Sequence, residues 1–202
     1  MKKKILTMAM AVVLLAGCGT LGNQGGLLGG IDGTSILGNV LGSVLGLNKI
    51  SQENLVGTWK YSGPGCAFTS DNLLAQAGGE VASQKIKSTL LTYYNSAGIS
   101  SSNTYFTFGN DNTFTAKVAG KTISGNYAYD PNSGQMTIKT LLFTINSYIT
   151  ASTSGISLLF ESQKLLTILQ TIGGMSGNAT LATIGELSKN YDGVRLGFEL
   201  GR

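Results

Sequence analysis

The stretch TYFTFGNDNTFTAKVAGKTISGNYAY, residues 104–129, decides the fold, because its side chains alternate between apolar and polar. Phe114, Ala116 and Val118, for example, alternate with threonine and lysine. A period of two is typical of β-strands with one face in a core and the other in solvent. The breaks at 109–112 and 119–120 contain the glycine, asparagine and aspartate that tight turns favour. The stretch therefore predicts antiparallel hairpins.

The same pattern extends over most of the chain after residue 54 and predicts eight strands. The last of them is the clearest, because Val194, Leu196, Phe198 and Leu200 all face one way. Eight antiparallel strands that close on themselves leave no sheet edge exposed. We therefore expect a mainly β (α+β) fold with an eight-stranded antiparallel barrel, its strands lying near 55–62, 104–109, 112–119, 121–129, 134–139, 141–150, 155–161 and 193–200.

Two segments have the period of an α-helix instead. Between Ser70 and Gly98 apolar residues recur at helical spacing, with a kink expected at Gly78-Gly79 and a cap at Gly98. Residues 162–190 contain two apolar stripes separated by glycines. We expect a helical insertion after the first strand and helices before the last one.

The N-terminus has the features of a bacterial signal peptide. Three lysines precede an apolar run too short to span a membrane, and Leu15-Ala16-Gly17-Cys18 follows. These four residues resemble the lipobox of bacterial lipoproteins, which implies removal of residues 1–17 and acylation of Cys18. Gly19, with no acidic run behind it, implies by the same resemblance a lipid anchor in the outer membrane that faces the periplasm.

Residues 18–50 form a glycine-rich segment that has two interpretations. With ten glycines from residue 19 to residue 50, it fits a tether between the acylated cysteine and a domain at 51–202. Glycines and leucines spaced by four in residues 35–47 also fit a helix that lies on the membrane or associates with another copy. The sequence leaves both open.

Charge and residue types exclude several classes of function. The leader holds three of the 14 basic residues, which leaves 11 against 10 acidic residues, and no basic cluster indicates nucleic-acid binding. The chain has no histidine, which removes the commonest general base and most zinc sites. The carboxylates are scattered, and Asp111 fits a hairpin turn better than a calcium loop. We expect no enzyme, no metal and no cofactor.

One cysteine remains once Cys18 is acylated. Cys66 follows Gly63-Pro64-Gly65, and its nearest lysine in sequence is Lys60. A nucleophilic thiolate needs a cationic or histidine neighbour. A small buried thiol at a bend in the strand is therefore the favoured interpretation.

The first strand begins with Gly57-Thr58-Trp59, after Leu55-Val56. This resembles the Gly-x-Trp signature of lipocalins and their calycin relatives. From Gln52 to Arg202 the chain resembles lipocalin-like (calycin-type) bacterial lipoproteins of unknown function. The resemblance implies a lipocalin-like barrel whose base Trp59 closes, with a late arginine stacked on the ring, and Arg195 and Arg202 are the two arginines of the chain.

The interior of such a barrel is either filled by side chains or hollow enough for one small ligand. The sequence does not decide between a filled and a hollow interior. Our leading hypothesis is a lipoprotein that binds a small hydrophobic ligand, with access beneath the 70–98 insertion and a wall lined by Phe106, Phe114, Tyr127 and Tyr129. The alternative is a structural or envelope-assembly lipoprotein that acts through protein contacts of its glycine-rich segment and helices.

Overall fold

The computed structural model describes residues 49–69, 78–173 and 193–202. The expected leader at 1–17, Cys18 and almost all of the glycine-rich segment lie outside the described residues. So do the first part of the insertion and residues 174–190 of the second helical segment.

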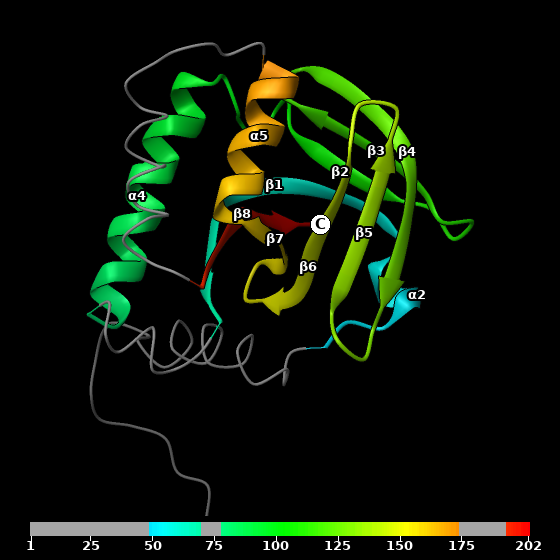
Figure 1. Ribbon diagram of the computed structural model, residues 1–202, viewed down its shortest axis with the longest axis horizontal. Coiled ribbons are helices and arrows are strands. Elements are labelled where there is room, and N and C mark those ends of the chain that lie inside the picture. The colour runs from blue at the N-terminus through cyan, green and yellow to red at the C-terminus, as the bar shows by residue number, and fades with distance from the viewer. Residues whose placement is uncertain (1–48, 70–77, 174–192) are drawn as a thin grey trace, which may run out of the picture. The chain divides into compact units, whose positions relative to one another are not determined.

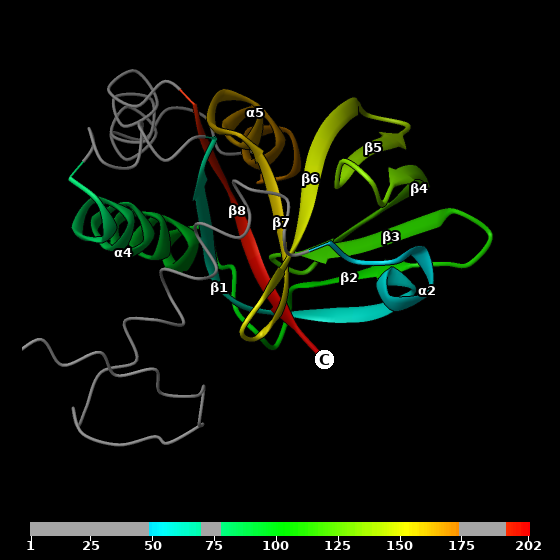
Figure 2. The ribbon, with the colours of Figure 1, turned by 90° about the horizontal axis from the view of Figure 1, so that it is seen from below.

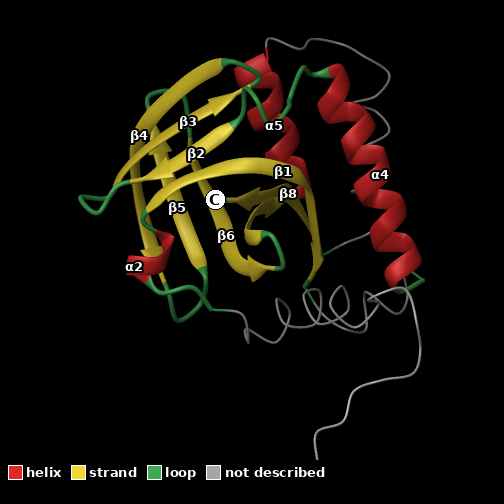
Figure 3. Ribbon diagram, turned by 180° about the vertical axis from the view of Figure 1, so that it is seen from behind, coloured by secondary structure: helices red, strands yellow, loops and turns green. Residues whose placement is uncertain are grey.

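Eight antiparallel strands form a closed barrel in which every strand pairs with its neighbours in sequence, and β8 pairs with β1 (Figures 1 and 3). This confirms the predicted fold class. The strands are β1 (Gly57–Phe68), β2 (Tyr105–Phe108), β3 (Thr113–Val118), β4 (Lys121–Asp130), β5 (Gln135–Thr140), β6 (Thr144–Ser152), β7 (Gly155–Glu161) and β8 (Val194–Gly201).

Strand β1 is longer than the alternation predicts, and it changes partner along its length. Gly57–Lys60 pair with β2, whereas Lys60–Phe68 pair with β8, with an irregularity between Tyr61 and Gly63. The sequence Gly63-Pro64-Gly65 breaks the period of two, which is why the alternation ends the strand at residue 62. Pairing with β8 nevertheless continues to Phe68.

Helix α4 (Glu80–Ser96) packs against β1 and β8, as Figure 2 shows. Its buried face includes Ile86, Leu90 and Tyr94. The Tyr94 ring stacks on Phe198 with 5.1 Å between centroids, and its hydroxyl donates to the Gly197 carbonyl at 2.8 Å. The insertion is therefore anchored to the barrel by an aromatic contact and a hydrogen bond.

Two further helices lie near the ends of strands. Short helix α2 (Gln52–Leu55) precedes β1, and Ser51 Oγ caps it by accepting from the Asn54 amide at 3.3 Å. Helix α5 (Ser162–Gly173) follows β7 directly and buries Leu165, Ile168 and Leu169. Within the described residues, no helix has the length and apolar character needed to cross a bilayer.

Candidate functional site: a groove beside the open end of the barrel

One end of the barrel is closed around Trp59, which is 6% exposed. Its indole N–H donates to the Leu55 carbonyl at 2.9 Å. The Arg202 guanidinium lies 4.3 Å from the indole centroid and donates to the Asn54 and Val56 carbonyls at 2.7 and 2.9 Å. Arg202 is therefore the arginine that stacks on Trp59, and it also ties the C-terminus to α2.

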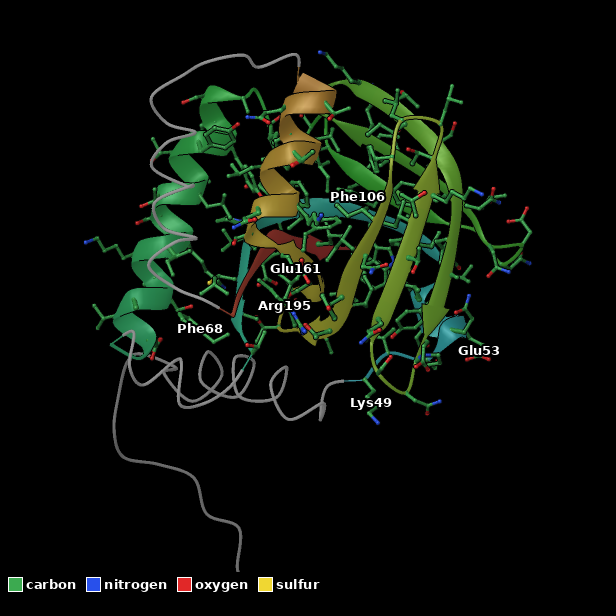
Figure 4. The ribbon with its side chains drawn as sticks, viewed as in Figure 1. Lys49, Glu53, Phe68, Phe106, Glu161 and Arg195 are labelled. Atoms are coloured by element: carbon green, nitrogen blue, oxygen red, sulfur yellow. The ribbon has the colours of Figure 1, made fainter. Side chains whose placement is uncertain are left out.

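Arg195 has a different position, on the outer face of β8. Its guanidinium lies 3.3 Å from the centroid of the Tyr148 ring. Burial lowers the pKa of Arg195, while the hydroxyl of Tyr148 and the carboxylate of Glu161 act to raise it. Figure 4 shows Glu161 and Arg195 next to each other, as expected from their pairing across β7 and β8.

Tyr127 and Tyr129, which the sequence predicted to line a ligand site, have their hydroxyls at the closed end. The Tyr127 hydroxyl donates to the Gly109 carbonyl at 2.8 Å and accepts from the Gln52 amide at 2.9 Å. The Tyr129 hydroxyl donates to the Ile50 carbonyl at 2.8 Å. Both find their partners in neighbouring chain segments, so neither lines the interior cavity or needs a ligand head group.

Phe106 and Phe114, in contrast, do line the cavity inside the barrel. Their centroids are 6.5 Å apart, and Phe106 also packs on Phe198 at 5.1 Å. The rings fill most of the interior and leave a cavity of about 20 Å³. Only apolar residues line it, namely Phe106, Phe114, Ala116, Val118, Ile123, Ile138, Phe143, Ile145, Phe160, Ile168 and Phe198. The space is that of about one water molecule, so the described side chains nearly fill this part of the barrel.

The barrel wall opens between β6 and β7. The two strands pair from Ser152–Gly155 to Tyr148–Leu159, while the first residues of β6 pair with β5 instead. Beyond Leu159, β7 pairs only with β8, and the chain then enters α5, which runs beside the start of β6 (Figure 1). The separation creates a groove of about 360 Å³, lined by Phe143, Thr144, Ile145, Asn146, Glu161, Lys164, Thr167, Ile168 and Thr171.

Phe143, Ile145 and Ile168 line both the groove and the interior cavity. Ile145 and Ile168 are 8% and 6% exposed, while Phe143 is half-buried. These three side chains therefore stand between an outer space with polar walls and an inner space with apolar walls. Such an arrangement suits a molecule that is polar at one end and apolar at the other.

The charge of the groove comes from Glu161 and Lys164. Glu161 faces Arg195 on the outer face of β8, and the positive guanidinium balances the negative charge of the Glu161 carboxylate. In the described part of the chain no carboxylate lies within ion-pair distance of Lys164, and the described ion pair joins Lys87 and Glu199 at 3.4 Å. Lys164 therefore gives the groove a positive end.

The groove lies beside α5, whereas the sequence placed ligand access beneath the 70–98 insertion. The described part of that insertion, α4, is packed onto β1 and β8 through Tyr94 and Ile86. The spacing of Lys164, Thr167 and Thr171 on one helix face could have indicated the groove. Their partner strand could not be known, because it depends on where β6 leaves β7.

The thiol of Cys66 is 5% exposed and lies on the face of β1 that α4 covers. Burial raises the pKa of the thiol to about 11, although a hydrogen bond with Ser83 and the charge of Lys87 oppose the shift. The thiol is therefore protonated at neutral pH, which does not favour a nucleophile.

Comparison with protein families identifies the fold family of the chain. A family model described as a lipocalin-like domain, DUF4923, matches residues 32–202. The chain belongs to this lipocalin-like family. The match begins within the glycine-rich segment, before the first described residue. Neither the curated proteins nor the solved structures gave a match.

Proposed function

We propose that the protein is an outer-membrane lipoprotein, anchored through Cys18 and facing the periplasm, that binds a small amphiphile in the groove between β6 and α5. The lipocalin-like fold supports a carrier role in general. The observation that carries the proposal is the contact between the polar groove and the apolar cavity at Phe143, Ile145 and Ile168.

The chemistry of the walls specifies the ligand. An anionic head group would meet the ammonium of Lys164, which donates charge-assisted hydrogen bonds, and the hydroxyl of Thr144, which is a neutral donor. An apolar tail would lie against Phe143 and Ile168. The ligand class is therefore a single-chain anionic amphiphile, of which a fatty acid is the simplest example.

The tail needs a local rearrangement to pass into the barrel. A cavity of about 20 Å³ holds no alkyl chain, so the ligand-free and ligand-bound states differ at the residues between the two spaces. Phe143 is the side chain placed to move, because it is half-buried and follows the loop between β5 and β6. The proposal includes no catalytic step.

The nearly filled barrel supports the second candidate, a structural or envelope-assembly lipoprotein that acts through its glycine-rich segment and helices. Organic extracts of gently purified protein separate the two candidates. A carrier yields one amphiphile in stoichiometric amount by mass spectrometry. An assembly protein yields none and binds no member of a panel of fatty acids, steroids and tetrapyrroles.

Direct binding tests the site itself. A dansyl-labelled undecanoic acid should bind the wild-type chain, and Lys164→Glu should weaken binding about tenfold or more, because it replaces attraction of the carboxylate with repulsion. Lys85→Glu, at an exposed lysine of α4, is the matched control and should bind like the wild type. Equal affinity of all three proteins would refute the assignment of Lys164.

A further inference from the structure

The loop between β5 and β6 presents two adjacent leucines to solvent. Leu141 is 98% exposed and Leu142 is 62% exposed. The described residues include two other large apolar side chains that are exposed, Val81 and Leu91, and these are not adjacent to each other. The leucine pair is therefore the most concentrated apolar surface in the described part of the chain.

Hydrogen bonds to Thr140 hold the loop in a fixed conformation. The Thr140 amide donates to the Phe143 carbonyl at 2.9 Å, which closes a tight hairpin with the leucines at its tip. The Thr140 hydroxyl oxygen accepts from the amides of Leu142 and Phe143 at 3.2 and 3.1 Å. The two side chains are thus presented by an ordered turn.

The turn itself does not require leucine. Hairpin tips favour glycine, asparagine, aspartate and serine, and the other tips of this barrel have them at 110–112, 119–120, 131–134 and 153–154. A leucine side chain that stays exposed contributes no burial free energy to folding. A role outside the folded domain explains the pair better than turn formation does.

Lysines surround the same end of the barrel. Lys117 and Lys121 flank the turn between β3 and β4, and Lys139 lies two residues before the leucines. In Figure 1 this turn, the β5–β6 loop and the C-terminal end of α5 lie along one upper edge of the barrel. The acidic residues Asp111 and Asp130 lie in turns at the opposite end, whereas Glu161, at the near end of β7, faces Arg195.

We infer that this end of the barrel docks on the surface of an anionic phospholipid bilayer. Leu141 and Leu142 would enter the boundary between head groups and acyl chains, and the lysines would lie over the lipid phosphates. Apolar insertion and basic charge are the two signals that peripheral membrane binding combines. The inference does not depend on ligand binding in the groove, although the groove begins at Phe143, beside the loop.

The length of chain before residue 49 permits this orientation. The described chain begins at the closed end of the barrel, where Ile50 meets Tyr129 (Lys49 and Glu53 mark this end in Figure 4). The 30 residues from 19 to 48 could extend over at most about 100 Å. A strand of ten residues, such as β4, is only about 33 Å long. An anchor at Cys18 is therefore compatible with the β5–β6 loop facing the same membrane.

Fluorescence of a tryptophan at the loop tests the inference with the full chain reconstituted in vesicles. Leu142→Trp places the loop reporter at the tip, and Asn132→Trp places a matched reporter at the closed end. In vesicles of phosphatidylglycerol with brominated acyl chains, emission of the loop reporter should fall at least twofold. The Asn132→Trp protein should behave like the wild type, whose Trp59 is buried.

Charge reversal tests the role of the lysines in the same vesicles. Lys121→Glu combined with Lys139→Glu should lower the equilibrium constant for docking by about 25-fold or more, since loss of each basic residue alone costs roughly fivefold. Lys49→Glu, at an exposed lysine of the closed end, is the charge control and should dock like the wild type.

Four results would overturn the inference. The loop reporter could remain unquenched, or the two reporters could be quenched equally, which would mean that no particular end faces the lipid. Quenching could be the same in phosphatidylcholine vesicles, which would remove the role of the lysines. A blue shift of the loop reporter that depends on protein concentration in the absence of vesicles would show that a second copy of the chain covers the leucines instead.

Discussion

At the scale of single residues, the closed end depends on a few contacts around Trp59. Arg202 covers one side of the indole and holds two carbonyls of the α2 segment. Gly155, the first residue of β7 after the tight turn from β6, lies against the same ring and has a φ of +143°. The last residue of the chain and this glycine thus fix the first strand of the barrel.

Replacing Arg202 by alanine should destabilise the protein by about 1–2 kcal/mol, because it removes two hydrogen bonds and a cation–π contact at a partly exposed site. Arg202→Lys should recover only part of this loss, since an ammonium lacks the planar fork that reaches both carbonyls. Urea unfolding monitored by Trp59 emission measures both variants. Identical midpoints for wild type and Arg202→Ala would contradict the prediction.

Gly155→Ala should cost more than about 2 kcal/mol of stability. A Cβ at this position would lie 2.5 Å from the Leu200 carbonyl oxygen and 2.9 Å from the Trp59 ring, in a backbone conformation that alanine disfavours. Gly120→Ala is the control, because its φ of +81° is also positive but no atom lies within 4 Å. It should lose only about 1 kcal/mol from backbone strain. Thermal unfolding of the two variants separates the loss of stability caused by steric overlap from the loss caused by backbone strain. Equal losses of stability in Gly155→Ala and Gly120→Ala would exclude the proposed contact with Trp59.

At the scale of secondary-structure elements, the interface between α4 and β1 buries ionisable groups. Burial raises the pKa of the Cys66 thiol from 9.0 to about 11 and that of the Tyr61 hydroxyl from 10.0 to about 12. Among the described residues, Tyr61 Oη is the buried side-chain polar atom that has no hydrogen-bond partner. The interface is therefore built for the neutral forms of both groups.

Stability should consequently fall at alkaline pH. The unfolded thiol ionises near pH 9 and the folded one only near pH 11, so the stabilisation from the neutral thiol is complete below pH 9 and is lost as the pH rises to 11. The loss should reach about 2–3 kcal/mol. Urea titrations at pH 8, 9, 10 and 11 measure how the free energy of unfolding falls with pH. Cys66→Ala is the control, because it has no thiol and should lack this part of the slope of unfolding free energy against pH. A wild-type slope equal to that of the control would rule out the buried thiol as its cause.

The elements show which features a sequence can predict. Strands such as β3 and β4 have local signals, because alternation and turn residues lie within the segment itself. The second half of β1 lacks a local signal, since Gly63–Gly65 form a strand only through pairing with β8, more than 130 residues away. The groove is less predictable still, because it depends on the register at which β6 leaves β7.

The partners of the two tyrosines are unpredictable for the same physical reason. The pattern correctly placed Tyr127 in the apolar face of β4, where it is 4% exposed. The partner of its hydroxyl, however, is a carbonyl in the neighbouring hairpin turn and an amide of α2. Composition and periodicity predict that a buried hydroxyl needs a partner, but only the closed fold determines which partner it finds.

At the scale of the whole molecule, the proposed function places an amphiphile-binding domain on a membrane anchor. Cys18→Ala should leave the leader uncleaved and abolish acylation, because the thiol is the acceptor in the lipobox that residues 15–18 resemble. Labelling of cells with radioactive palmitate measures this, and Cys66→Ala is the matched control that should still be labelled. Palmitate on the Cys18→Ala protein would refute the lipid anchor.

The boundary of the folded domain is the remaining question at this scale, because the family match begins at residue 32 and the expected domain at residue 51. We expect the boundary slightly before residue 51, since the Ile50 carbonyl accepts from Tyr129 and the Gln52 amide donates to Tyr127. We expect residues 49–202 to fold as a soluble monomer with the stability of the mature chain.

Truncation on either side of Ile50 tests this boundary. A chain that begins at residue 53 should be less stable than residues 49–202 by about 1–3 kcal/mol, because it leaves the hydroxyl of Tyr129 without its carbonyl and that of Tyr127 without its amide. Circular dichroism and urea unfolding of the two truncated proteins and of the mature chain give the comparison. If residues 49–202 were unfolded, or several kcal/mol less stable than the mature chain, the glycine-rich segment would pack as part of the domain and the tether interpretation would be wrong.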